Sequence, residues 1–223
     1  MRCRGFGRRR LPTASLGALV AIAVAATGAP AAELEGKALV EALRDGGYNI
    51  YFRHAATDWG QDDRVEMAGD WTSCDPAEMR QLSSQGRATA RRIGDAIRAL
   101  GVPVAKVLSS EYCRAWETAR LMDLGPVTKT PDIVNMRVVA HVGSRDAAIR
   151  RAQRVLAQPP AAGENVVIVG HGNLMRAATG AYASEGGSGV YAPRSGSEQG
   201  FELVARLSPN DWMRLADSMD EDG

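Results

Sequence analysis

Aromatic residues, histidines and cysteines are scarce in this 223-residue chain, and long hydrophobic runs are nearly absent. Phe, Trp and Tyr make up 5% of the sequence, and there are three histidines and three cysteines. Outside the N-terminus no apolar stretch is long enough to span a bilayer, which argues against a polytopic membrane protein. With 45% hydrophobic and 24% charged residues, the composition is that of a soluble globular protein that fits one domain.

An excess of positive charge is also absent from the body of the protein. The formal net charge is +1, but five of the 27 basic residues precede the first acidic residue, Glu33. Without these five, 22 basic residues stand against 26 acidic ones, a net charge of −4. This balance argues against nucleic acid as a partner. Residues 218–223 are expected to form an acidic, solvated tail.

The N-terminus has the three-part layout of a secretory signal peptide. Five arginines lie within the first ten residues, an apolar run covers residues 16–26, and Ala29 and Ala31 form an A-x-A cleavage pattern. We therefore expect residues 1–31 to be removed and residues 33–217 to form the mature domain, exported to the periplasm or secreted. The arginine run leaves Sec and twin-arginine export open. A membrane-anchoring helix is the alternative, but eleven apolar residues are too few to span, so the mature chain is not expected to insert in a membrane.

The expected state of the cysteines follows from the predicted export. Cys3 would leave with the signal peptide, so that Cys74 and Cys113 remain as an even pair in an oxidising compartment. This favours a disulfide between them, and two buried free thiols are the alternative.

The rest of the chain alternates between strand and helix patterns. This alternation predicts an α/β fold, a three-layer αβα sandwich with a mostly parallel sheet and helices on both faces. A polar loop is expected at 58–81 and a mobile glycine-rich loop at 184–200. The predicted strands are 48–52, 104–108, 127–130 and 166–169, with a closing pair at 201–207 and 212–216, and the predicted helices are 85–100, 112–122, 146–158 and 173–182.

Three segments at the carboxyl ends of predicted strands carry the chemistry. They are residues 52–59 (FRHAATDW), 108–119 (LSSEYCRAWETA) and 169–173 (VGHGN). In a parallel sheet this edge is where ligands bind, so two arginines and two histidines should converge there. Arginine presents a donor fork that suits phosphate oxygens, and an imidazole among such groups can attack phosphorus.

Together these segments resemble the histidine phosphatase superfamily, also called phosphoglycerate mutase-like. Residues 53–59 are similar to its RHGETxW motif, residues 109–119 to its second phosphate-pocket motif, and residues 170–172 to its second-histidine motif. The resemblance implies that His54 is the nucleophile, that Arg53, Arg114 and His171 complete the phosphate pocket, and that Thr57 lines its mouth. It also implies a metal-independent phosphatase without a cofactor, acting on a small phosphorylated molecule. The oligomeric state is not readable from the sequence.

The sequence departs from the family pattern at several positions. Ala55 replaces a glycine, and Gly172 follows the second histidine where one branch has an aspartate. The other branch takes its proton donor from a glutamate, and our alignment places Asn135 there. Asp132 or His141 could substitute as donor. Without a donor, the alternative is a phosphate-binding pseudoenzyme without turnover.

Two further expectations concern acidic residues. Glu117 lies three positions after Arg114 on the predicted helix and is expected to orient it. The acidic residues of the 58–81 loop are expected to be solvated rather than to bind a metal.

Overall fold

The computed structural model describes Met1 and residues 33–221, and the predicted signal peptide otherwise lies outside the described residues. A six-stranded sheet has the order β3-β2-β4-β1-β5-β6. Neighbours among β3, β2, β4 and β1 are parallel, whereas β5 is antiparallel to both β1 and β6. The strands are β1 (Asn49–Arg53), β2 (Val104–Ser109), β3 (Val127–Lys129), β4 (Asn165–Gly170), β5 (Ser188–Pro193) and β6 (Phe201–Leu207). The helices are α1 (Gly36–Asp45), α2 (Ser84–Ala99), α3 (Cys113–Met122), α4 (Arg145–Ala157), α5 (Gly172–Thr179) and α6 (Pro209–Glu221), with short 3₁₀ helices at Asp70–Thr72, Pro131–Ile133 and Met136–His141.

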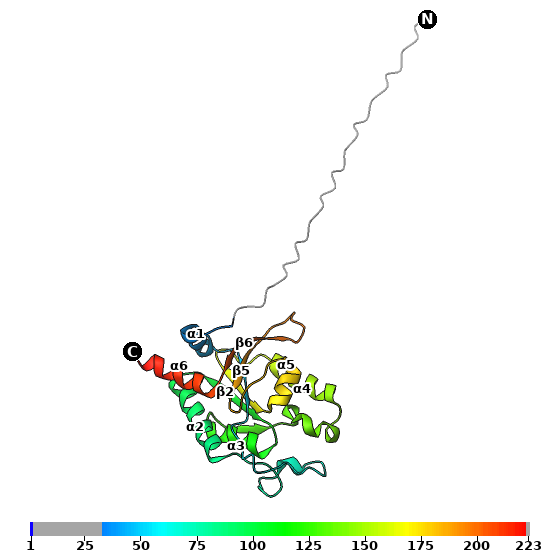
Figure 1. Cartoon of the computed structure of the whole chain (residues 1–223). Helices are drawn as coiled ribbons and strands as arrows, with labels where there is room; N and C mark the ends of the chain where they lie inside the picture. The colour runs from blue at the N-terminus through cyan, green and yellow to red at the C-terminus, as the bar shows by residue number, and fades with distance from the viewer. Residues whose placement is uncertain (2–32, 222–223) are drawn as a thin grey trace. The chain divides into compact units, whose positions relative to one another are not determined.

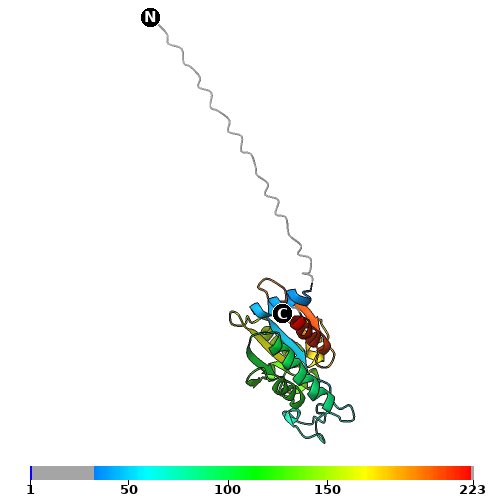
Figure 2. The same ribbon diagram turned by 90° about the vertical axis from the view of Figure 1, so that its left-hand side faces the viewer.

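Alternating side chains of the central strands build two cores, one on each face of the sheet. On β1, Ile50 and Phe52 join the core under α1, α2, α3 and α6, while Tyr51 joins the core under α4 and α5. Figure 1 shows the two helix groups on opposite sides of the sheet, and Figure 2 looks onto the side covered by α2 and α6. The predicted α/β sandwich with a mostly parallel sheet is confirmed.

The prediction of a mobile loop at 184–200 is wrong for its central part. Strand β5 lies there, between β1 and β6, and its first four residues are buried. A Cβ at Gly189 would lie 2.7 Å from the Tyr191 hydroxyl, so this glycine makes room for a buried ring. Here glycine serves close packing, which composition alone does not distinguish from flexibility.

The predicted strand at 212–216 is also wrong, because these residues lie in α6. The Ser208 hydroxyl accepts a hydrogen bond from the Asp211 amide, and the Asp211 carboxylate accepts one from the Ser208 amide. This reciprocal pair is a capping box, and Pro209 occupies the first helical position. The helix runs to Glu221 and so includes part of the expected acidic tail.

The sheet aligns the ends of its central strands at one edge. Arg53, the last residue of β1, pairs with Gly170, the last of β4, and Ser109 at the end of β2 pairs with Val169. The residues that follow these strands therefore meet at the same edge. Between residues 33 and 221, no helix is both long and apolar enough to cross a membrane.

Candidate active site

The two strand-end histidines lie side by side because β1 and β4 are in register. His54 follows Arg53 and His171 follows Gly170, and the centroids of the two imidazole rings are 5.5 Å apart. Both side chains are almost completely buried. The pairing that the sequence motifs predicted is thus brought about by the strand register.

The hydrogen bonds of His54 leave one ring nitrogen as an acceptor. Nδ1 lies 2.9 Å from the Ala55 carbonyl oxygen, which can only accept, so Nδ1 carries the proton. Nε2 then bears a lone pair, and the Arg114 Nε–H donates to it at 3.3 Å. Burial, and then the positive charge of Arg114, hold the pKa of His54 well below its usual range. The ring is therefore neutral, and its unprotonated Nε2 accepts the hydrogen bond from Arg114.

Arg114 is held by an acidic residue of the 58–81 loop. The Asp63 carboxylate accepts hydrogen bonds from both terminal nitrogens of the Arg114 guanidinium, at 2.8 and 3.0 Å. Both side chains are buried. The expectation that Glu117 orients Arg114 is wrong, because Glu117 pairs with Arg87. For Asp63 the expectation of a solvated side chain is wrong as well. The sequence carried no signal for this pair, since the two residues lie 51 positions apart.

His171 is fixed by Asn135 and Ser110. The Asn135 amide oxygen accepts from the Arg137 backbone N–H and from Asn173, so its NH₂ group is left to donate to Nδ1 of His171 at 3.1 Å. The Nε2–H of His171 then donates to the Ser110 hydroxyl at 2.9 Å. Burial, followed by the charge of Arg114, lowers the pKa of His171 well below its usual range. Asn135 thus orients His171 and holds it in one neutral tautomer.

The structure does not bring three of the predicted site residues to the two histidines. Asp132 lies 3.6 Å from Arg151 and borders a different hollow, and His141 packs against Trp71. Neither of these proton-donor candidates lines the cavity beside His54. Thr57, expected at the pocket mouth, does not line it either, and its hydroxyl donates to Glu185 at 3.1 Å.

Two close contacts fix the segment after His54. The Ala55 amide donates to the Thr118 hydroxyl of α3, which itself donates to the Arg114 carbonyl oxygen. A Cβ at Gly86 would lie 2.0 Å from the Ala56 carbonyl oxygen. The close approach of α2 to this segment is therefore possible only because residue 86 is a glycine. The methyl group of Ala55 is fully buried in the core and is accommodated there.

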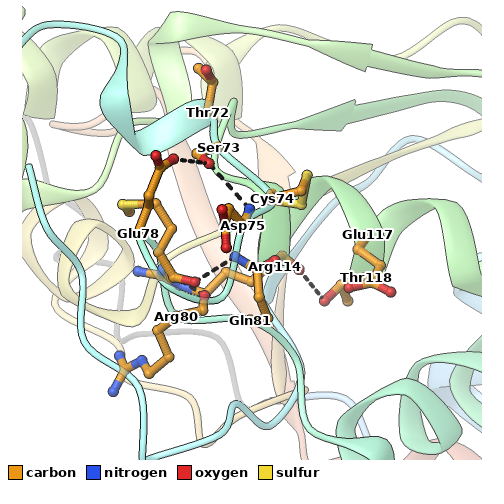
Figure 3. Close-up of a disulfide and its surroundings, with 12 residues drawn as sticks. Thr72, Ser73, Cys74, Asp75, Glu78, Arg80, Gln81, Arg114, Glu117 and Thr118 are labelled. Carbon is orange, nitrogen blue, oxygen red and sulfur yellow. Dashed lines mark hydrogen bonds between the residues drawn. A yellow bond between two sulfur atoms is a disulfide. The ribbon is translucent and has the colours of Figure 1, made fainter.

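The predicted disulfide between Cys74 and Cys113 is confirmed. It joins the 58–81 loop to the first residue of α3, beside Arg114 (Figure 3). The loop that carries Asp63 is therefore attached covalently to the helix that carries Arg114. A hollow of about 590 Å³ lies next to this bond, but neither histidine borders it.

A cavity of about 270 Å³ opens over His54 and His171. Its volume suits a small ligand. No side chain that lines it within residues 33–221 is a carboxylic acid, and this part of the chain has no group of three or more His, Cys, Asp or Glu placed to hold a metal ion. The side chains at the cavity belong to Arg53, His54, Trp59, Arg80, Arg114, Asn135, Arg137, His171, Asn173, Arg176 and Tyr182.

Several of these residues were missed by sequence reasoning. Arg80 comes from the 58–81 loop, Arg137 from the segment after β3, and Arg176 from α5. None of them belongs to a motif at a strand end, and only the tertiary structure brings them together. Glu185, 3.4 Å from Arg53, was likewise hidden in a region expected to be mobile.

Part of the chain matches a known protein family. Residues 50–154 match the model of the histidine phosphatase superfamily (branch 1), and this part of the chain belongs to that superfamily. No curated protein matches the sequence.

Two solved structures align with this chain at low identity. A protein from Escherichia coli K-12 assigned as an alpha-ribazole-5'-P phosphatase is 17% identical, with a TM-score of 0.51 over 74% of this chain and 98% of its own. The mycobacterial glucosyl-3-phosphoglycerate phosphatase is 18% identical, with a TM-score of 0.48 over 70% of this chain and 96% of its own.

Proposed function

We propose that this protein is an exported, metal-independent phosphatase that hydrolyses phosphomonoesters through a phosphohistidine on His54. The observation that carries the proposal is the unprotonated Nε2 of a neutral, buried His54, which borders the cavity and accepts a 3.3 Å hydrogen bond from Arg114. Nε2 attacks phosphorus, the bond to the leaving oxygen breaks, and water then hydrolyses the N–P bond. Arg114 and Arg53 stabilise the negative charge on the phosphoryl oxygens during both transfers.

The proposal has a consequence for the leaving group. Because no described carboxylic acid lines the cavity, a basic alkoxide would leave without a proton from such a group. General acid catalysis contributes about 10²–10⁴-fold. We therefore expect kcat for aryl phosphates to exceed kcat for alkyl phosphates by about 100-fold or more. Phosphorylated nitrogen, which can be protonated before cleavage, would be a second suitable substrate class. Equal kcat values, with transfer to His54 shown to be limiting by single-turnover kinetics, would contradict this.

The lack of a carboxylic acid among the described residues that line the cavity supports a second candidate function, a phosphate-binding pseudoenzyme without turnover. The two functions are separated by rapid mixing with an aryl phosphate and a denaturing alkaline quench, conditions under which phosphohistidine survives. A phosphatase gives a phosphorylated protein and multiple turnovers, whereas a pseudoenzyme binds the probe and gives neither.

The matched control uses a histidine that lies outside the cavity. His54→Ala should lose both the phosphorylated protein and turnover, and His141→Ala, outside the cavity, should retain both. Activity of His54→Ala within tenfold of wild type would exclude the proposed nucleophile. Export is tested by N-terminal sequencing of protein recovered outside the cytoplasm, which should begin at Ala32.

A further inference from the structure

The cavity over His54 holds more positive charge than one phosphate group requires. Five arginines line it. Arg114 pairs with Asp63 and Arg53 with Glu185, whereas Arg80, Arg137 and Arg176 have no acidic partner within 4.0 Å among the described residues. Since both histidines are held neutral, five positive charges face two negative ones. The residues of the cavity and their acidic partners therefore carry a surplus of three positive charges.

A phosphomonoester does not use up this surplus. A phosphate monoester carries about −1.5 to −2 charges at pH 7, so at least one positive charge remains without a partner. Uncompensated like charges that converge on one cavity destabilise the free protein, and an anion bound there relieves the repulsion.

Two of the three unpaired arginines also lie at a different depth from the histidines. His54 and His171 are buried at the base of the cavity, whereas Arg137 and Arg176 are exposed. Their charges are therefore available to the outer end of a substrate, away from the reacting phosphoryl group.

Arg80 is held at the cavity by stacking, but one of its donors has no hydrogen-bond partner among the described residues. Its guanidinium stacks on the exposed Trp59 ring, 4.3 Å from the centroid, and its buried Nε has no hydrogen-bond partner among the described residues. Burial and repulsion from Arg114, with a smaller effect of Arg137, lower the pKa of Arg80. The stacking fixes the orientation of this donor and leaves its hydrogen-bonding capacity for a ligand.

We propose that Arg80, Arg137 and Arg176 form a subsite for a second anionic group, a carboxylate or a second phosphate, at the end of the substrate remote from the scissile bond. This rests on the proposed function, because it assigns the phosphoryl group to His54. The substrate class is thus a small phosphate ester with at least one further negative charge.

The test uses three aryl phosphates that differ only in the para substituent. They are 4-(carboxymethyl)phenyl phosphate, its neutral amide and 4-(phosphonomethyl)phenyl phosphate, in which a methylene group keeps the leaving phenols nearly equal. Wild type should show a kcat/KM for at least one anionic probe about tenfold above that for the amide, and high salt should reduce this ratio. The better anionic probe tells a carboxylate from a second phosphate.

The variants locate the effect. Partly exposed charge pairs are worth up to about fivefold in affinity. At least one of Arg80→Gln, Arg137→Gln and Arg176→Gln should therefore lower the ratio about two- to fivefold. Arg91→Gln, an exposed arginine on α2 outside the cavity, is the matched control and should leave the ratio unchanged. No preference for either anionic probe, or a ratio unchanged in all three variants, would overturn the proposal.

A binding measurement separates this proposal from the proposed function. Calorimetric titration of His54→Ala with the same three probes measures the preference without turnover. If wild type hydrolyses none of the probes, the proposed function fails, and the calorimetric preference alone decides on the anionic subsite.

Discussion

At the scale of single residues, the site depends on one buried ion pair. Asp63 accepts two hydrogen bonds from Arg114 and a third from the Arg80 backbone N–H at 3.2 Å. This carboxylate holds the guanidinium so that its Nε–H faces His54. Asp63 is a positioning residue, since it does not line the cavity itself.

Asp63→Ala should therefore destabilise the protein and impair the site. Removing one partner of a buried pair leaves an unpaired buried charge, and we expect a loss of about 3 kcal/mol or more in the free energy of unfolding. Urea denaturation measures it. Asp62→Ala, at the exposed neighbouring position, is the control and should change stability by less than about 0.5 kcal/mol. Equal effects of the two substitutions would contradict the role given to Asp63.

At the scale of elements, the 58–81 loop contributes to the site although most of it has no regular secondary structure. Residues 58–81 contain one short 3₁₀ helix, yet they supply Trp59, Asp63 and Arg80 to the site. The disulfide from Cys74 to Cys113 attaches this loop to α3 (Figure 3). The bond restricts the loop to positions in which Asp63 can reach Arg114.

Removing the disulfide should lower both stability and activity. The bond joins residues 39 positions apart in the sequence, for which the chain-entropy model gives about 2–4 kcal/mol. The Cys74→Ser/Cys113→Ser variant should show that loss in urea denaturation and a lower kcat/KM than wild type, whereas Thr72→Ala, an exposed position in the same loop, should show neither. Free thiols other than Cys3 in the unreduced, denatured protein would argue against the bond.

At the scale of the whole molecule, two buried neutral histidines couple stability to pH. Burial lowers the pKa of His54 and of His171 in the folded state, while unfolded histidines titrate near pH 6.5. Below about pH 6.5 the unfolded state therefore binds more protons than the folded state, and acid favours unfolding.

The free energy of unfolding should accordingly fall as the pH drops from 7 toward 5. Each histidine contributes up to about 1.4 kcal/mol per pH unit, until its folded-state pKa is reached. Urea denaturation at pH 7, 6 and 5 measures the slope. The double variant His54→Gln/His171→Gln should lose most of it, and the same slope in that variant would assign the effect to other groups.

Much of the fold follows from the sequence because local patterns determine it. The buried run at 166–169, the amphipathic stretch at 85–100 and the alternation of strand and helix are each set by side chains close together in the chain. They predicted the αβα arrangement and the edge where His54 and His171 meet. The capping box of α6 was present in the sequence as Ser208 and Asp211, with Pro209 between them, but the prediction placed a strand at 212–216 instead.

What only the tertiary structure decided depends on residues far apart in the chain. The sequence determined that Arg114 and His54 belong to one site, but not that Asp63 would hold the arginine or that Asn135 would orient His171. Ion pairs and amide hydrogen bonds between distant residues follow no periodic pattern in the sequence, because the packing of loops against helices determines which side chains meet. Gly189 shows the same limit, since only its contact with Tyr191 distinguishes a packed strand from a flexible loop.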